Sequence, residues 1–152
     1  MDRISAKERS LLMAAIKSSG TKPEQILAAA LRAQGIRIRR IYGPEKIDIA
    51  MPRHNLAIFV DGCFWHQCPK HSHLPKSNRS YWVPKLEANK KRSKAKDLRL
   101  RRKGWSVVHI WEHSLASETE ANAQAQHIIK KFNIDKVAIH YRLLQGNLLG
   151  LS

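Results

Sequence analysis

The residues best suited to chemistry lie together in one short stretch of the chain, residues 59–73. It follows an apolar run, Leu56 to Val60, and it contains one acid, two thiols and three imidazoles: Asp61, Cys63, His66, Cys68, His71 and His73. A buried strand accounts for the apolar run but not for the acid and imidazoles directly after it. Carboxylates and imidazoles bind metals and carry protons, and thiolates bind zinc. The stretch therefore predicts an active site beside a zinc site.

The spacing Cys63-x4-Cys68-x2-His71 offers three zinc ligands within nine residues. Structural zinc is usually tetrahedral, so a fourth ligand is needed. His73 would supply it locally, and His113 would supply it from beyond a later predicted strand. We favour His113, because that strand is expected to join the same sheet. The alternative is two buried thiols with solvent-exposed histidines.

Two predicted strands, Ile47 to Met51 and Leu56 to Val60, are joined by a four-residue hairpin loop. If Met51 pairs with Leu56, then Asp48 and Asp61 share a face of the hairpin as diagonal neighbours, close enough to serve one cation. A register slip of one residue would separate them.

A helix is predicted from Thr21 to Gly35, with Thr21 as N-cap and Glu24 completing a capping box. Glu24 therefore has a structural reason to be there, and the residues alone make an active-site role the minority interpretation.

The other predicted elements complete a mixed α/β domain around a small sheet. They are a strand over 36–39, a loop over 69–80, a basic helix over 84–103, a strand over 105–111 and an exposed C-terminal helix over 118–132. We expect a basic N-terminal arm or helix over 1–20 that contacts DNA, a core over 21–133 and a tail of unknown role over 134–152.

The charge balance indicates a polyanionic partner. The chain of 152 residues has 28 Lys and Arg against 12 Asp and Glu, a formal net charge of +16. Much of this charge lies in the predicted helix over 84–103, where like charges would repel unless phosphates neutralise them. Since no apolar run approaches the length of a membrane span, we expect a cytosolic protein without a membrane partner. We also expect a monomer that is associated with the nucleoid when bound to DNA.

Several motifs follow one another in the order of a known family. The most specific are Gly62-Cys-Phe-Trp-His66 and Trp111-Glu112, supported by Thr21-Lys-Pro-Glu24, Cys68-Pro-Lys-His71, Pro75-Lys-Ser-Asn78 and Gly104-Trp105. Over roughly residues 3–115, the sequence resembles the very short patch repair (Vsr-type) endonucleases, which nick DNA at T:G mismatches.

The resemblance implies a restriction-endonuclease-like core, a catalytic Mg²⁺, a structural Zn²⁺ and double-stranded DNA with a T:G mismatch as the substrate. It implies that Asp48 and the main-chain carbonyl of Val60 hold Mg²⁺, that His66 is the general base, and that Glu24 supports the attacking water.

Further roles are implied for the zinc site and for DNA contact. Zinc would be held by Cys63, Cys68, His71 and His113. Phe64, Trp65 and Trp82 would push between base pairs, and Lys85, Asn89 and Arg92 belong to the matched pattern on the DNA-contacting helix.

The sequence departs from the family pattern at four positions near the site, one of which is His113, where some members have a thiolate. Position 61, often a second histidine, is Asp61, which would add a carboxylate and remove one proton shuttle; position 47 is Ile rather than Pro, and position 93 is Ser rather than Asp. Three other interpretations remain: a restriction-type or general endonuclease, a zinc-stabilised DNA-binding module without catalysis, and a basic protein on an anionic membrane.

Overall fold

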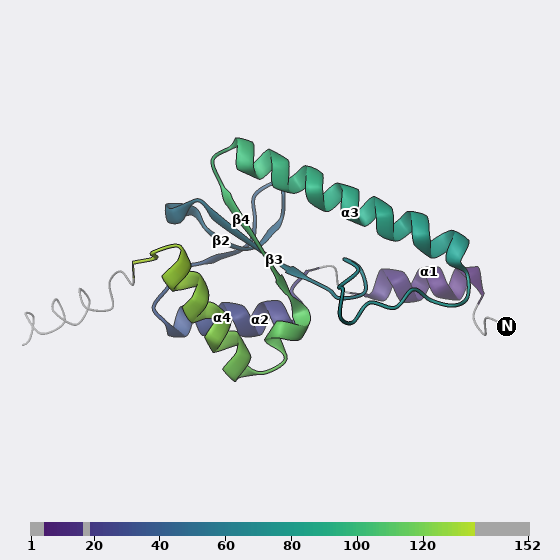
Figure 1. Cartoon of the computed structure of the whole chain (residues 1–152), viewed down its shortest axis with the longest axis horizontal. Coiled ribbons are helices and arrows are strands. Elements are labelled where there is room, and N and C mark those ends of the chain that lie inside the picture. Colours follow the sequence, from purple (N-terminus) through teal and green to yellow (C-terminus); the bar gives the residue numbers. More distant parts are fainter. Residues whose placement is uncertain (1–4, 17–18, 136–152) are drawn as a thin grey trace, which may run out of the picture.

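A computed structural model describes residues 5–16 and 19–135, and the described elements surround one mixed four-stranded sheet (Figure 1). The strands lie in the order β1-β2-β3-β4, in which β2 is antiparallel to both β1 and β3, and β4 is parallel to β3. The strands are β1 Arg39–Tyr42, β2 Ile47–Met51, β3 Leu56–Asp61 and β4 Ser106–Trp111. The helices are α1 Ala6–Ala15, α2 Lys22–Ala33, α3 Arg79–Arg102 and α4 Glu118–Lys131, with short 3-10 helices η1 Pro52–His54 and η2 Glu112–Leu115.

The predicted hairpin register is confirmed. Met51 pairs with Leu56 and Ile49 with Ile58. The loop closes because η1 turns the chain and Asn55 adopts a left-handed conformation, φ 46°, which Asn tolerates better than most residues. The hairpin therefore brings Asp48, near the start of β2, beside the end of β3.

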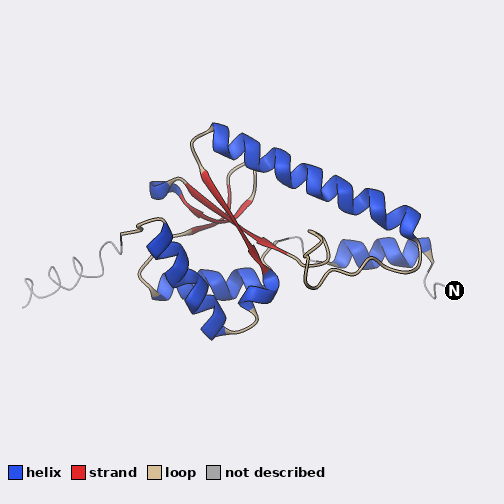
Figure 2. Ribbon diagram, in the orientation of Figure 1, coloured by secondary structure: helices blue, strands red, loops and turns tan. Residues whose placement is uncertain are grey.

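Helices cover both faces of the sheet, as Figure 2 shows. On one face, α2 and α4 bury a large apolar cluster that includes Leu27, Leu31, Ile58 and Ile128. On the other face, α3 contributes mainly Leu100 to a smaller cluster around Phe59. The rest of α3 extends past the sheet, beyond the end of β3 (Figure 1). This architecture confirms the predicted α/β class.

Strand β1 begins at Arg39, so the prediction of a strand from Ile36 was wrong. Gly35 ends α2 in a left-handed conformation, φ 79°, and the Ile36 N–H donates back to the carbonyl of Leu31. This helix ending turns Ile36 into the core, where its side chain is 5% exposed. Ile36 is therefore buried by the C-terminal cap of α2 and not by a strand.

Helix α3 begins at Arg79, five residues before the predicted start at Pro84, so the end of the predicted loop was wrong. Pro84 was taken as the first helical residue, but it lies inside the helix. Pro84 has no backbone N–H to donate to the carbonyl of Ser80. Because Ser80 is exposed, water can hydrate that carbonyl instead. Buried Trp82 anchors this first part of the helix.

Helix α4 has the predicted position, but it is not simply exposed. Ala121, Ala125 and Ile128 are buried against α2. Their spacing of four and three residues places them on one stripe of the helix. Short alanine side chains let the two helices approach, and a search for large apolar residues misses such a stripe.

The N-terminal segment forms the helix that was one of its two predicted states, with Ser5 and Glu8 making a reciprocal cap. Residues 1–4 and 17–18, and the tail from 136 onward, lie outside the described residues. Among the helices that are described, none is long and apolar enough to cross a bilayer.

Candidate active site and metal centre

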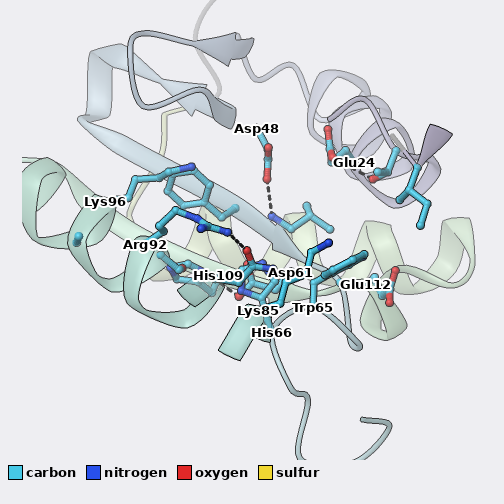
Figure 3. Close-up of a pocket in the computed structure, with 18 of the residues that line it drawn as sticks. Glu24, Asp48, Asp61, Trp65, His66, Lys85, Arg92, Lys96, His109 and Glu112 are labelled. Carbon is cyan, nitrogen blue, oxygen red and sulfur yellow. Dashed lines mark hydrogen bonds and ion pairs between the residues drawn. The ribbon is translucent and has the colours of Figure 1, made fainter. Parts of the chain in front are cut away.

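A cavity of about 720 Å³ opens where β3 and β4 end. Its walls come from α1, α2, β2, β3, α3, β4 and η2, and the polar residues that line it include Glu24, Asp48, Asp61, His66, Lys85, Asn89, Arg92, Lys96, His109 and Glu112. In Figure 3, Glu24 and Asp48 lie in the upper part of the view, and Asp61, His66 and His109 lie in the lower part. The fold therefore brings together the predicted catalytic residues from three separate segments of the chain.

Asp48 is partly buried beside the end of β3. Its Oδ2 atom accepts a hydrogen bond of 2.9 Å from the main-chain N–H of Val60. The pKa of Asp48 is raised to about 6, mainly by burial and also by the negative charges of Glu24 and Asp61, against the lowering effect of the hydrogen bond from Val60. Such a site favours a bound cation, because a positive charge would offset the cost of ionising Asp48.

Glu24 is 2% exposed, and its carboxylate accepts three hydrogen bonds. They come from the Gly20 N–H at 2.7 Å, the Thr21 hydroxyl at 3.0 Å and Arg40 Nη2 at 3.2 Å. Thr21 is the N-cap residue, but its hydroxyl donates to Glu24 instead of accepting from the helix backbone. The predicted capping box is therefore wrong in detail: Glu24 is fixed by the turn before α2 and by Arg40.

Asp61 is buried, and it faces two imidazoles. Its Oδ1 lies 3.8 Å from Nε2 of His66, and its Oδ2 lies 2.8 Å from Nδ1 of His109. Nε2 of His109 lies 3.0 Å from both carboxylate oxygens of Asp97 on α3. The hydrogen bond with Asp61 is the main cause that raises the pKa of His109, with Asp97 adding to it and burial opposing it.

The sequence did not predict His109, Asp97 or Glu112 as site residues. The parallel register sets His109 beside Phe59, and only this pairing of distant strands brings it to Asp61. Glu112 follows β4 and accepts a hydrogen bond of 2.7 Å from the Cys63 N–H, so it holds the loop after β3. The Trp111-Glu112 motif was a signal for Glu112, but no local pattern marks His109.

A second group of side chains joins the loop after β3 to η2. The ligand atoms of Cys63, Cys68, His71 and His113 all lie within 4.8 Å of one another. Cys63 Sγ is 3.1 Å from Nδ1 of His113, and Cys68 Sγ is 3.8 Å from Nδ1 of His71. His73 is not one of the four. Two thiols and two imidazoles form a donor set that fits a tetrahedral metal ion.

Three aromatic side chains gather beside the cavity. The Phe64 ring centroid is 5.1 Å from that of Trp65 and 5.2 Å from that of Trp82. Phe64 and Trp65 are half-buried, while Trp82 is 9% exposed. The Lys85 ammonium lies 5.7 Å from the Trp65 ring centroid, which adds a cation to the aromatic edge of the cavity.

One stripe of α3 lines the cavity along its length. The stripe is formed by Lys85, Asn89, Arg92, Lys96 and Arg99. Their alternating spacing of four and three residues keeps them on one side of the helix. Asn89 accepts a hydrogen bond from Arg92, and Arg99 forms two hydrogen bonds with Glu45, at 2.7 and 2.9 Å. The basic side chains therefore face the same space as Asp48 and His66.

Comparison with known proteins identifies the family. The family model described as DNA mismatch endonuclease Vsr matches residues 1–72. Type II nicking enzyme V.NaeI of Lentzea aerocolonigenes is 42% identical over 112 residues, which cover 69% of this chain and 68% of the relative. The chain belongs to the Vsr family of DNA endonucleases.

Two further relatives of this family show the same relationship over more of the chain. Type II nicking enzyme V.XorIIP of Xanthomonas oryzae pv. oryzae is 37% identical over 132 residues, covering 84% of this chain and 96% of the relative. DNA mismatch endonuclease Vsr of Escherichia coli is 31% identical over 122 residues, covering 77% of each. The small mixed sheet flanked by helices is accordingly a restriction-endonuclease-like core, as the sequence predicted.

Proposed function

We propose that this Vsr-family endonuclease nicks one strand of duplex DNA at T:G mismatches, 5′ to the mismatched T, with Mg²⁺ as cofactor. One observation carries the proposal: the buried carboxylate of Asp48 and the imidazole of His66 line one cavity, between a basic stripe and an aromatic cluster. A phosphodiester in this cavity would lie beside the positive charge of α3, and His66 would be near enough to accept a proton from the water that attacks it.

The carboxylate of Asp48 and the main-chain carbonyl of Val60 are suited to hold Mg²⁺, because this ion prefers oxygen ligands and usually keeps several waters. When bound, Mg²⁺ would neutralise the charge that develops on the phosphate. His66 would take the proton from the attacking water. Glu24, fixed by the Gly20 N–H and Arg40, would hold that water in line for attack.

We propose that Cys63, Cys68, His71 and His113 hold a structural Zn²⁺. Two of these ligands flank Phe64 and Trp65, so the ion would fix the direction of both rings. The aromatic cluster would then enter the base stack at the mismatch, where a wobble pair is easier to unstack than a matched pair.

Lys85, Asn89 and Arg92, which line the cavity on α3, would contact the phosphate backbone beside the aromatic cluster. Helix α1 would approach the same duplex, because Met13 and Ile16 line the cavity and Leu11 is 64% exposed.

Nicking of end-labelled duplexes tests the proposal. We expect cleavage of the T strand of a T:G duplex in Mg²⁺, little cleavage of the matched T:A duplex, and no cleavage of either in EDTA. Equal cleavage of both duplexes would overturn mismatch recognition and favour a restriction-type or general endonuclease. Binding without any cleavage would favour a zinc-stabilised DNA-binding module.

A further inference from the structure

We propose that His109 is a positioning residue for the proton acceptor: it holds Asp61 so that this carboxylate orients the imidazole of His66. The inference rests on the proposed nicking reaction and adds a second imidazole to its machinery. This imidazole comes from β4, outside the segment that contains Asp61 and His66, and Asp97 on α3 holds it in place.

The two hydrogen bonds of His109 define its role. Nδ1 faces Asp61 at 2.8 Å, and Nε2 faces both oxygens of Asp97 at 3.0 Å. An ionised carboxylate only accepts hydrogen bonds, so both ring nitrogens must donate. His109 therefore acts as a two-ended donor that links Asp61 to Asp97.

Asp61 is in turn committed to one orientation. It is 7% exposed, and because Oδ2 accepts from His109, Oδ1 remains for His66. Oδ1 lies 3.8 Å from Nε2 of His66, longer than a hydrogen bond, and contacts of this kind often tighten when substrate binds. A carboxylate beside Nε2 favours the tautomer with its proton there, which leaves Nδ1 of His66 to accept a proton from water.

Rigid elements fix this chain of contacts. His109 stands beside Phe59 in the parallel register, and the two rings stack with centroids 5.5 Å apart. Asp97 approaches from α3, so two strands and one helix determine where the Asp61 carboxylate points. This arrangement bears on the departure from the family pattern at position 61. The histidine often found there is replaced by Asp61, and an imidazole is supplied instead by His109, which is hydrogen-bonded to Asp61.

A simpler role is that His109 only fastens α3 to the sheet through Asp97. The two roles depend on different ring nitrogens, because positioning uses Nδ1 and fastening uses Nε2. The side-chain amide of Asn can replace the donor at Nδ1, and the longer amide of Gln can replace the donor at Nε2. His109→Asn and His109→Gln therefore separate the two roles.

The experiment measures kcat and KM for nicking of the T:G duplex in Mg²⁺. We expect His109→Gln to lower kcat about 10- to 100-fold, as the loss of a supporting partner commonly does, and to leave KM within about twofold. His109→Asn should restore most of kcat. Asp97→Asn is the matched control, and it should lower kcat less than His109→Gln, because the contact with Asp61 remains.

A second readout does not depend on activity. The ring signals of His66, assigned by their loss in His66→Ala, should shift in nuclear magnetic resonance spectra of His109→Gln and return toward wild type in His109→Asn. Unchanged His66 signals in His109→Gln would overturn the positioning role. Losses of kcat and thermal stability in His109→Asn that His109→Gln does not show would leave only the fastening role.

Failure of the proposed function would look different. A wild-type protein that nicks neither duplex would refute the proposed reaction, while the His66 signals would still show whether His109 orients that ring.

Discussion

At the scale of single residues, Asp48 is the group whose own charge is most costly in the metal-free protein. Burial raises its pKa from an ordinary value of 3.8 to about 6. A carboxyl with a raised pKa stabilises the folded state below its unfolded pKa, and it loses that contribution as the pH rises through its folded pKa. Asp48 should therefore lower the stability of the metal-free protein progressively between about pH 4 and pH 6.

We predict that Asp48→Asn stabilises the metal-free protein by about 1–2 kcal/mol at pH 8, after allowance for partial solvent screening. The same variant should lose nicking but keep DNA binding, which depends on the basic surface. Thermal unfolding without added Mg²⁺ and without chelator, at pH 4 and pH 8, measures the effect, with Asp135→Asn, on an exposed residue, as the control. A gain of the same size at both pH values would contradict the assigned pKa.

His66 provides a second test at this scale. We predict that His66→Ala lowers kcat for nicking by about 10²- to 10⁴-fold, the usual effect of removing a positioned base. His54→Ala is a suitable control, because His54 is exposed in the loop between β2 and β3. Single-turnover nicking rates would decide it, and parallel losses in both variants would mean that His66 has no special role.

Trp65 is a better probe than Trp82 of whether the aromatic cluster enters the base stack. Because Trp82 is buried, Trp82→Ala should lower the unfolding temperature as well as mismatch nicking. We predict that Trp65→Ala weakens nicking of the T:G duplex while leaving the unfolding temperature close to wild type. Calorimetry beside the nicking assay measures both, and an equal loss of stability in the two variants would place Trp65 in the core instead.

At the scale of elements, we expect only the cavity side of α3 to contribute its charge to DNA binding. We predict that Arg92→Ala, on the cavity stripe, weakens DNA binding and reduces the salt dependence of log K by about one phosphate contact. Lys94→Ala is the matched control, because Lys94 is exposed and does not line the cavity. Binding measured by fluorescence anisotropy across a salt series gives the slopes. Identical slopes for both variants would mean that charge, and not position, determines binding.

Elements were predictable where a local pattern determines them. The β2–β3 hairpin follows from two apolar runs and a four-residue turn, and the Met51–Leu56 register came with it. The start of α3 was not predictable, because proline is a common first residue of a helix, and the packing of Trp82 against Phe64 and Trp65 depends on the tertiary fold. The site residues within 59–73 were visible from their types, whereas His109 required the β3–β4 pairing, which no local pattern encodes.

At the scale of the whole molecule, the Cys63, Cys68, His71 and His113 group joins distant parts of the chain. We predict about one tightly bound zinc per chain, and lower stability and zinc content together in Cys68→Ser. His113→Ala should also lose zinc, and His73→Ala, the matched control, should keep it. Metal analysis after dialysis decides this, and zinc retention in His113→Ala would assign the fourth ligand elsewhere.

The distance along the sequence between Cys63 and His113 has a consequence for folding during synthesis. These residues are 50 positions apart, and the loop they close contains all of α3 and β4. A cross-link across such a loop removes about 4 kcal/mol of chain entropy from the unfolded state. During synthesis, Cys63, Cys68 and His71 leave the ribosome before β4 does, so the proposed zinc ion would have at most three of its ligands until His113 is made. A nascent chain or a fragment that ends before β4 would thus carry the basic helix without an assembled catalytic end, and DNA would be cut only by chains synthesised past His113.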